Sequence, residues 1–113
     1  MEDVEAGSLV VVHCTNPREK VWGLLVRLDL VGAVVRGMDL NSVEDWLLQE
    51  RAGRDGLIGP FTFFLPLHRV LRIDLEERGG VVPSYGERYR NACGRDVRDA
   101  LIGRNGSTDR SGE

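Results

Sequence analysis

The most chemically reactive side chains in this sequence are two histidines and two cysteines. His13 and Cys14 are neighbours, whereas His68 and Cys93 stand alone. The segment around His13 is rich in Val and predicts a strand, in which successive side chains point to opposite faces of the sheet. His13 and Cys14 are therefore poorly placed to share one metal ion, and the pattern favours a surface His beside a core Cys.

The same geometry argues against catalysis. A Cys–His nucleophile pair would need both side chains on one face, and no Gly-x-Ser-x-Gly segment is present to hold a serine nucleophile. The carboxylates Asp74, Glu76 and Glu77 close a predicted strand, which is typical of a solvated edge. We therefore expect a non-enzymatic protein that needs no cofactor and no metal.

Composition points to one globular domain. The chain has 113 residues, of which 42% are hydrophobic and 29% charged. The net charge of −3 argues against broad electrostatic binding to nucleic acid. No apolar run approaches the ~20 residues that cross a bilayer, and the acidic N-terminal segment lacks the apolar centre of a signal peptide. Two distant cysteines are typical of free thiols in a reducing compartment, so we expect a cytoplasmic protein without a membrane partner.

Apolar segments separated by Gly, Pro and Asn predict five strands. They lie at 9–14, 21–29, 33–38, 61–65 and 70–76. The last strand alternates most clearly, which predicts that Leu71 and Ile73 face the core together with Leu25. Gly23 has no Cβ and allows the second strand to bend sharply, as a small barrel requires.

Two further regions predict helices. Residues 42–52 carry Val43, Trp46 and Leu47 at i, i+3, i+4 spacing, with Asn41 or Ser42 as the N-terminal cap. Residues 83–102 form a C-terminal helical extension that opens with a capping box. This extension is either one helix that tolerates Gly94 or two helices separated by it. Around the barrel at 8–78, residues 1–7 are expected to be a flexible lead and 103–113 a disordered tail.

Three residues carry a family resemblance. Gly23, Leu25 and Asp29 fall at Gly-x-Leu-x-x-x-Asp spacing, and residues 9–76 resemble the Sm/Hfq superfamily of small β-barrels. The chain is also similar to uncharacterised bacterial members with this barrel. The resemblance implies a mainly β fold, a five-stranded Sm/SH3-like small barrel, here with one inserted helix and a C-terminal helical extension.

The resemblance also implies a partner. In Sm-like proteins, strands four and five of neighbouring subunits pair. Phe61, Phe63 and Phe64 give the fourth strand an apolar edge of this kind. We therefore expect a homo-oligomeric interaction or assembly module. Trp22 and Trp46 are either part of a partner surface or structural residues covered by a helix.

The alternative function is specialised RNA binding. His68 lies where the Hfq branch carries a Tyr-Lys-His segment, and Arg69 and Arg72 could contact phosphate. Pro66 and Leu67 replace the Tyr and Lys of that segment, so we expect RNA binding to be weak.

Overall fold

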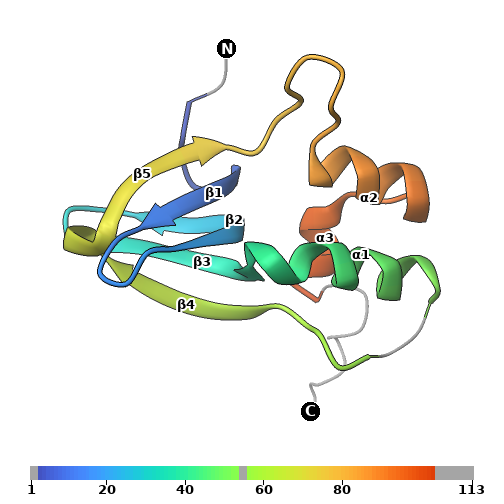
Figure 1. Cartoon of the computed structure of the whole chain (residues 1–113), viewed down its shortest axis with the longest axis horizontal. Coiled ribbons are helices and arrows are strands. Elements are labelled where there is room, and N and C mark those ends of the chain that lie inside the picture. Colours follow the sequence, from blue (N-terminus) through green and yellow to red (C-terminus); the bar gives the residue numbers. More distant parts are fainter. Residues whose placement is uncertain (1–2, 54–55, 104–113) are drawn as a thin grey trace.

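A single antiparallel sheet forms the centre of the protein. The computed structural model describes residues 3–53 and 56–103. The strands are β1 (Leu9–Cys14), β2 (Glu19–Leu28), β3 (Gly32–Asp39), β4 (Phe61–Pro66) and β5 (Val70–Leu75). Their spatial order is β4-β3-β2-β1-β5, so β5 returns to pair with the first strand (Figure 1). The mainly β prediction is confirmed, but the sheet is not closed into a barrel, because β4 and β5 do not pair with each other.

The inserted helix begins differently from the prediction. α1 spans Val43–Arg51 and follows a 3₁₀ turn, η1, at Leu40–Ser42. Asp39 caps this turn by accepting a hydrogen bond from the Asn41 backbone N–H at 3.0 Å. Ser42 makes no side-chain cap, so the prediction of a cap at Asn41 or Ser42 is wrong. The 3₁₀ turn moves the capping position towards the end of β3.

The C-terminal extension forms two helices, α2 (Tyr85–Cys93) and α3 (Val97–Leu101). The predicted capping box is confirmed, since Ser84 and Glu87 bond each other's backbone N–H groups at 3.1 and 2.9 Å. Gly94 ends α2 with φ of 76°, in the left-handed region that glycine adopts without strain. The two-helix alternative is therefore correct.

The described part of the N-terminal lead contacts the folded chain. The Gly7 N–H donates to the Leu25 carbonyl at 2.8 Å, and the Gly7 carbonyl accepts from Arg98 Nε at 2.8 Å. Apart from Gly103, the tail expected at 103–113 lies outside the described residues.

Both faces of the sheet carry a hydrophobic core. On one face, Trp22, Leu24 and Met38 pack against residues of the helices. The other face holds a second cluster whose buried members come from β1 to β4, namely Val10, Val12, Cys14, Val21, Leu25, Ala33, Val35 and Leu65. Phe63 of β4 and Val70 and Ile73 of β5 pack against it. The alternation of side chains along β1 assigns successive residues to the two clusters.

Two facing glycines let β2 and β3 approach closely. Gly23 pairs with Gly37 in the ladder. A Cβ on Gly37 would lie 2.0 Å from the Trp22 carbonyl oxygen and 2.6 Å from the Gly23 Cα. A Cβ on Gly23 would lie 2.4 Å from the Arg36 carbonyl oxygen. Glycine is therefore required at both positions. The sequence indicates a special role for Gly23 but not for Gly37.

A bulge in β5 overturns the prediction for Leu71. His13 pairs with Arg72, but the next residue, Cys14, pairs with Val70, so Leu71 is left out of the ladder. Its side chain is 66% exposed, whereas Ile73 packs against the second cluster. The extra residue breaks the period-two alternation from which a core position was predicted.

The bulge predicts a small stability effect at Leu71. Leu71→Ala should lower the free energy of unfolding by no more than about 0.5 kcal/mol, as for other exposed positions. Leu25→Ala should cost about 2–5 kcal/mol, because Leu25 is fully buried. Urea denaturation of both variants, at a concentration where the chain is monomeric, gives the comparison, and equal losses would mean that the β5 register is different.

Candidate functional site

The outer edge of β4 is an apolar pairing surface at one end of the sheet order. Within residues 3–53 and 56–103, β4 pairs only with β3, and β5 pairs only with β1. The sequence of β4, Phe-Thr-Phe-Phe-Leu-Pro, contains no charged residue. Phe61 and Phe64 are 56% and 45% exposed, and the rings of Phe61 and Phe63 lie 5.1 Å apart. Edge strands are usually protected by charges, so β4 can accept another strand.

An apolar cluster adjoins this edge at the turn between β2 and β3. The Leu67 N–H donates to the Val31 carbonyl at 2.9 Å, and the Phe64 ring lies over Gly32. Val31, Phe64 and Leu67, which we call the hairpin-end cluster, are all exposed. The three helices gather at the other end of the sheet (Figure 1), so they leave this cluster uncovered.

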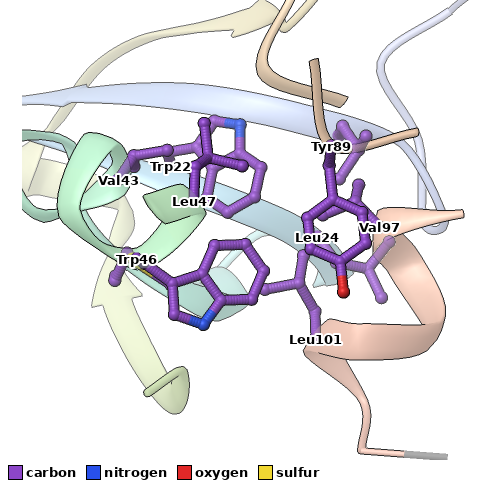
Figure 2. Packing of buried hydrophobic residues seen from close by; sticks show 10 residues of the cluster. Trp22, Leu24, Val43, Trp46, Leu47, Tyr89, Val97 and Leu101 are labelled. Carbon is purple, nitrogen blue, oxygen red and sulfur yellow. The ribbon is translucent and has the colours of Figure 1, made fainter. Parts of the chain in front are cut away.

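Trp22 and Trp46 lie inside the protein. They are 0% and 2% exposed, with ring centroids 5.8 Å apart (Figure 2). The Tyr89 ring stacks on Trp46 at 5.4 Å, and its hydroxyl donates to Glu50 at 2.7 Å. Burial, with the hydrogen bond to Glu50, raises the pKa of Tyr89. The packing therefore supports the interpretation of Trp22 and Trp46 as structural residues covered by helices, and not as part of a partner surface.

Two of the three RNA-binding candidates, Arg69 and Arg72, form ion pairs within the chain. The Arg69 guanidinium donates to the Thr15 and Pro17 carbonyls at 3.1 and 2.9 Å and pairs with Glu19 at 2.7 Å. These bonds hold the turn between β1 and β2. Arg72 pairs with Asp74 on the same strand, whereas His68 is exposed in the 3₁₀ turn η2 (Leu67–Arg69).

His13 and Asp74 form a polar contact that the sequence did not predict. His13 Nε2 lies 2.8 Å from Asp74 Oδ2, and Arg72 also donates to this carboxylate. Burial raises the pKa of Asp74, but the hydrogen bonds and charges of His13 and Arg72 lower it more, to below its ordinary value of 3.8. Asp74 lies on the edge strand β5 and stays 40% exposed, as the sequence predicted, but it also holds an ion pair that the sequence did not predict.

This lowered pKa predicts an acid-dependent contribution to stability. The folded state holds Asp74 ionised more strongly than the unfolded state does, so the contribution is present above about pH 4 and is lost as pH falls through the folded pKa. Asp74→Asn should be less stable than the parent chain at neutral pH. Thermal unfolding from pH 7 to pH 2 should show the two curves converging at the acid end, and a constant difference would contradict the assignment.

The reactive residues of the sequence lie apart. Cys14 is buried in the second cluster, and burial raises the pKa of its thiol. Cys93 is also a free thiol and is partly buried. In the described part of the chain, no three His, Cys, Asp or Glu side chains gather so that they could hold a metal ion. None of the helices that the structure describes is long and apolar enough to cross a membrane.

A polar cavity of about 270 Å³ lies between the start of β1, Glu76 just after β5, and the helices α2 and α3. Glu76 reaches into this region from the end of β5 and accepts hydrogen bonds from the Tyr85 and Gly86 N–H groups at 2.7 and 3.2 Å. Glu76 therefore caps the N-terminus of α2, whereas the sequence predicted that its carboxylate would be solvated. In the sequence, the signal for this contact is a carboxylate, Glu76, that precedes the Ser84 capping box.

The surface that these observations favour is the uncharged β4 edge with the hairpin-end cluster beside it. Comparison of the chain with models of known protein families, with curated proteins and with solved structures finds no match.

Proposed function

We propose that this protein is a non-enzymatic assembly module that associates with copies of itself through the edges of its sheet. The observation that carries the proposal is β4, an aromatic edge strand without a charged residue. Pairing removes such an edge from water and satisfies its outward N–H and C=O groups.

The sheet order supports β5 of a second copy as the pairing strand. β4 and β5 lie at opposite ends of the order β4-β3-β2-β1-β5, and each contains 6 residues. A contact between two different edges is head-to-tail, and it generates a ring if the rotation between copies closes. We propose on this basis that the sheet is an open form of the Sm/SH3-like small barrel.

Light scattering over a range of protein concentrations tests the proposal. The parent chain should show a mass that rises to that of an oligomer, with slow amide exchange over residues 61–66 in the associated form. The double variant Phe61→Lys, Phe64→Lys should stay monomeric, because two charges on the edge oppose pairing. Leu57→Lys is the matched control, since Leu57 is fully exposed and lies before β4. A monomeric parent chain at every concentration would refute self-association.

RNA binding has less support, because Arg69 and Arg72 are already paired within the chain. Titration of a fluorescent U-rich oligomer at physiological salt should show no tight complex, given the net charge of −3. Sub-micromolar binding that is lost in His68→Ala, with the fold intact by circular dichroism, would favour the RNA alternative instead.

A further inference from the structure

Leu71 is an apolar residue that the β5 bulge turns away from the core. The bulge removes Leu71 from the ladder with β1 and leaves two thirds of its side chain exposed. Bulges commonly re-aim one side chain of an edge strand. On either side of Leu71, Val70 and Ile73 pack inward against the second cluster. Among the apolar residues of β5, Leu71 is therefore the exposed one.

The surroundings of Leu71 carry little net charge. Arg72 and Asp74 pair with each other at 3.0 Å, so their opposite charges compensate on the same strand. The other free edge of the sheet has an uncharged strand, β4, and the exposed hairpin-end cluster of Val31, Phe64 and Leu67. Leu71 beside the Arg72–Asp74 ion pair can therefore pack against an uncharged apolar surface such as the hairpin-end cluster. The contact would remove no unpaired charge of β5 from water.

We propose that Leu71 of one copy packs into the hairpin-end cluster of the next copy. This inference rests on the proposed self-association and names side chains that form its apolar contact. The occupant is a second copy, because every chain carries both halves of the contact, one at each edge strand of the sheet, on strands of 6 residues each. Backbone pairing of β4 with β5 provides the register, and Leu71, near the start of β5, provides apolar burial at one end of the paired strands.

The first test is Leu71→Asp, measured by sedimentation equilibrium. The dissociation constant should rise about tenfold or more, because a charge would enter the apolar contact. Val81→Asp is the control, since Val81 is 89% exposed and lies between β5 and α2. The control should leave association unchanged. Circular dichroism should show that both variants keep the parent fold, because both positions are exposed.

The second test is cross-linking between copies. Leu71→Cys and Leu67→Cys are prepared as separate proteins in a Cys93→Ser background, in which Cys14 stays buried. A short bismaleimide should link the two variants when they are mixed, and should link neither variant to itself. Self-linking of Leu71→Cys would place two β5 edges together and would overturn the inference.

The two proposals fail in different ways. An oligomer that is insensitive to Leu71→Asp, and that gives no mixed cross-link, would refute the role of Leu71 and leave edge pairing in place. A parent chain that stays monomeric would refute both.

Discussion

Trp46→Ala is expected to lower the free energy of unfolding by about 3–5 kcal/mol, the range for removing a buried aromatic ring. Trp46 is 2% exposed and lies between Trp22 and the stacked ring of Tyr89 (Figure 2). Its loss would leave a cavity between α1, α2 and the sheet. The loss should appear in urea denaturation at a concentration where the chain is monomeric.

Leu48→Ala is the matched control, because Leu48 lies on the same helix and is more than half exposed. It should change stability by no more than about 0.5 kcal/mol. If Trp46 were part of a partner surface, Trp46→Ala would instead weaken association and leave monomer stability almost unchanged. That result would contradict the packing described above.

Gly37→Ala is expected to lower the free energy of unfolding by about 1–3 kcal/mol, and by more if the strands separate. The added methyl group would meet backbone atoms of β2, with the nearest, the Trp22 carbonyl oxygen, at 2.0 Å. A backbone cannot rotate aside as a flexible side chain can, so β2 and β3 must move apart. Their separation should speed amide exchange in both strands as well as lower the urea midpoint.

Gly59→Ala provides the comparison for Gly37→Ala. A Cβ at Gly59 would meet no atom within 4 Å. This variant should be neutral or slightly stabilised, because Ala has less conformational freedom than Gly in the unfolded chain. Equal behaviour of the two variants would show that β2 and β3 do not approach closely at Gly37.

Much of the fold could be predicted from local signals. The strand at Leu9–Cys14 is found as its Val-rich pattern predicts, and the Ser84 capping box and the Gly94 stop depend only on neighbouring residues. The buried stripe of α1, including Trp46, also follows from spacing within one helix. Such features are encoded within a few residues of sequence, so one chain suffices to identify them.

The errors concern relations between distant segments. The register of β5 against β1 decides that Leu71 is exposed, and a period-two pattern carries no information about a bulge. Arg69 is a second example, because its charge suggested phosphate binding. Its partners, Glu19 and the Thr15 and Pro17 carbonyls, lie about 50 residues earlier in the chain, so the sequence around Arg69 does not indicate them. For the candidate site, the sequence indicated the aromatic strand, but only the sheet order shows that, among the described strands, β4 pairs on one side alone.

The position of β1 in the sheet has a consequence for how the chain folds during synthesis. β1 leaves the ribosome before the other four strands of the sheet, yet one of its two neighbours, β5, is made last of the five, and Val12 faces Ile73 across that ladder. Until β5 emerges, one side of β1 lacks its partner and remains open to wrong pairing. Glu76, which caps α2, follows β5 directly, so the C-terminal helices can be fixed in place only after that strand has joined the sheet. The late, long-range step is expected to limit the rate of folding.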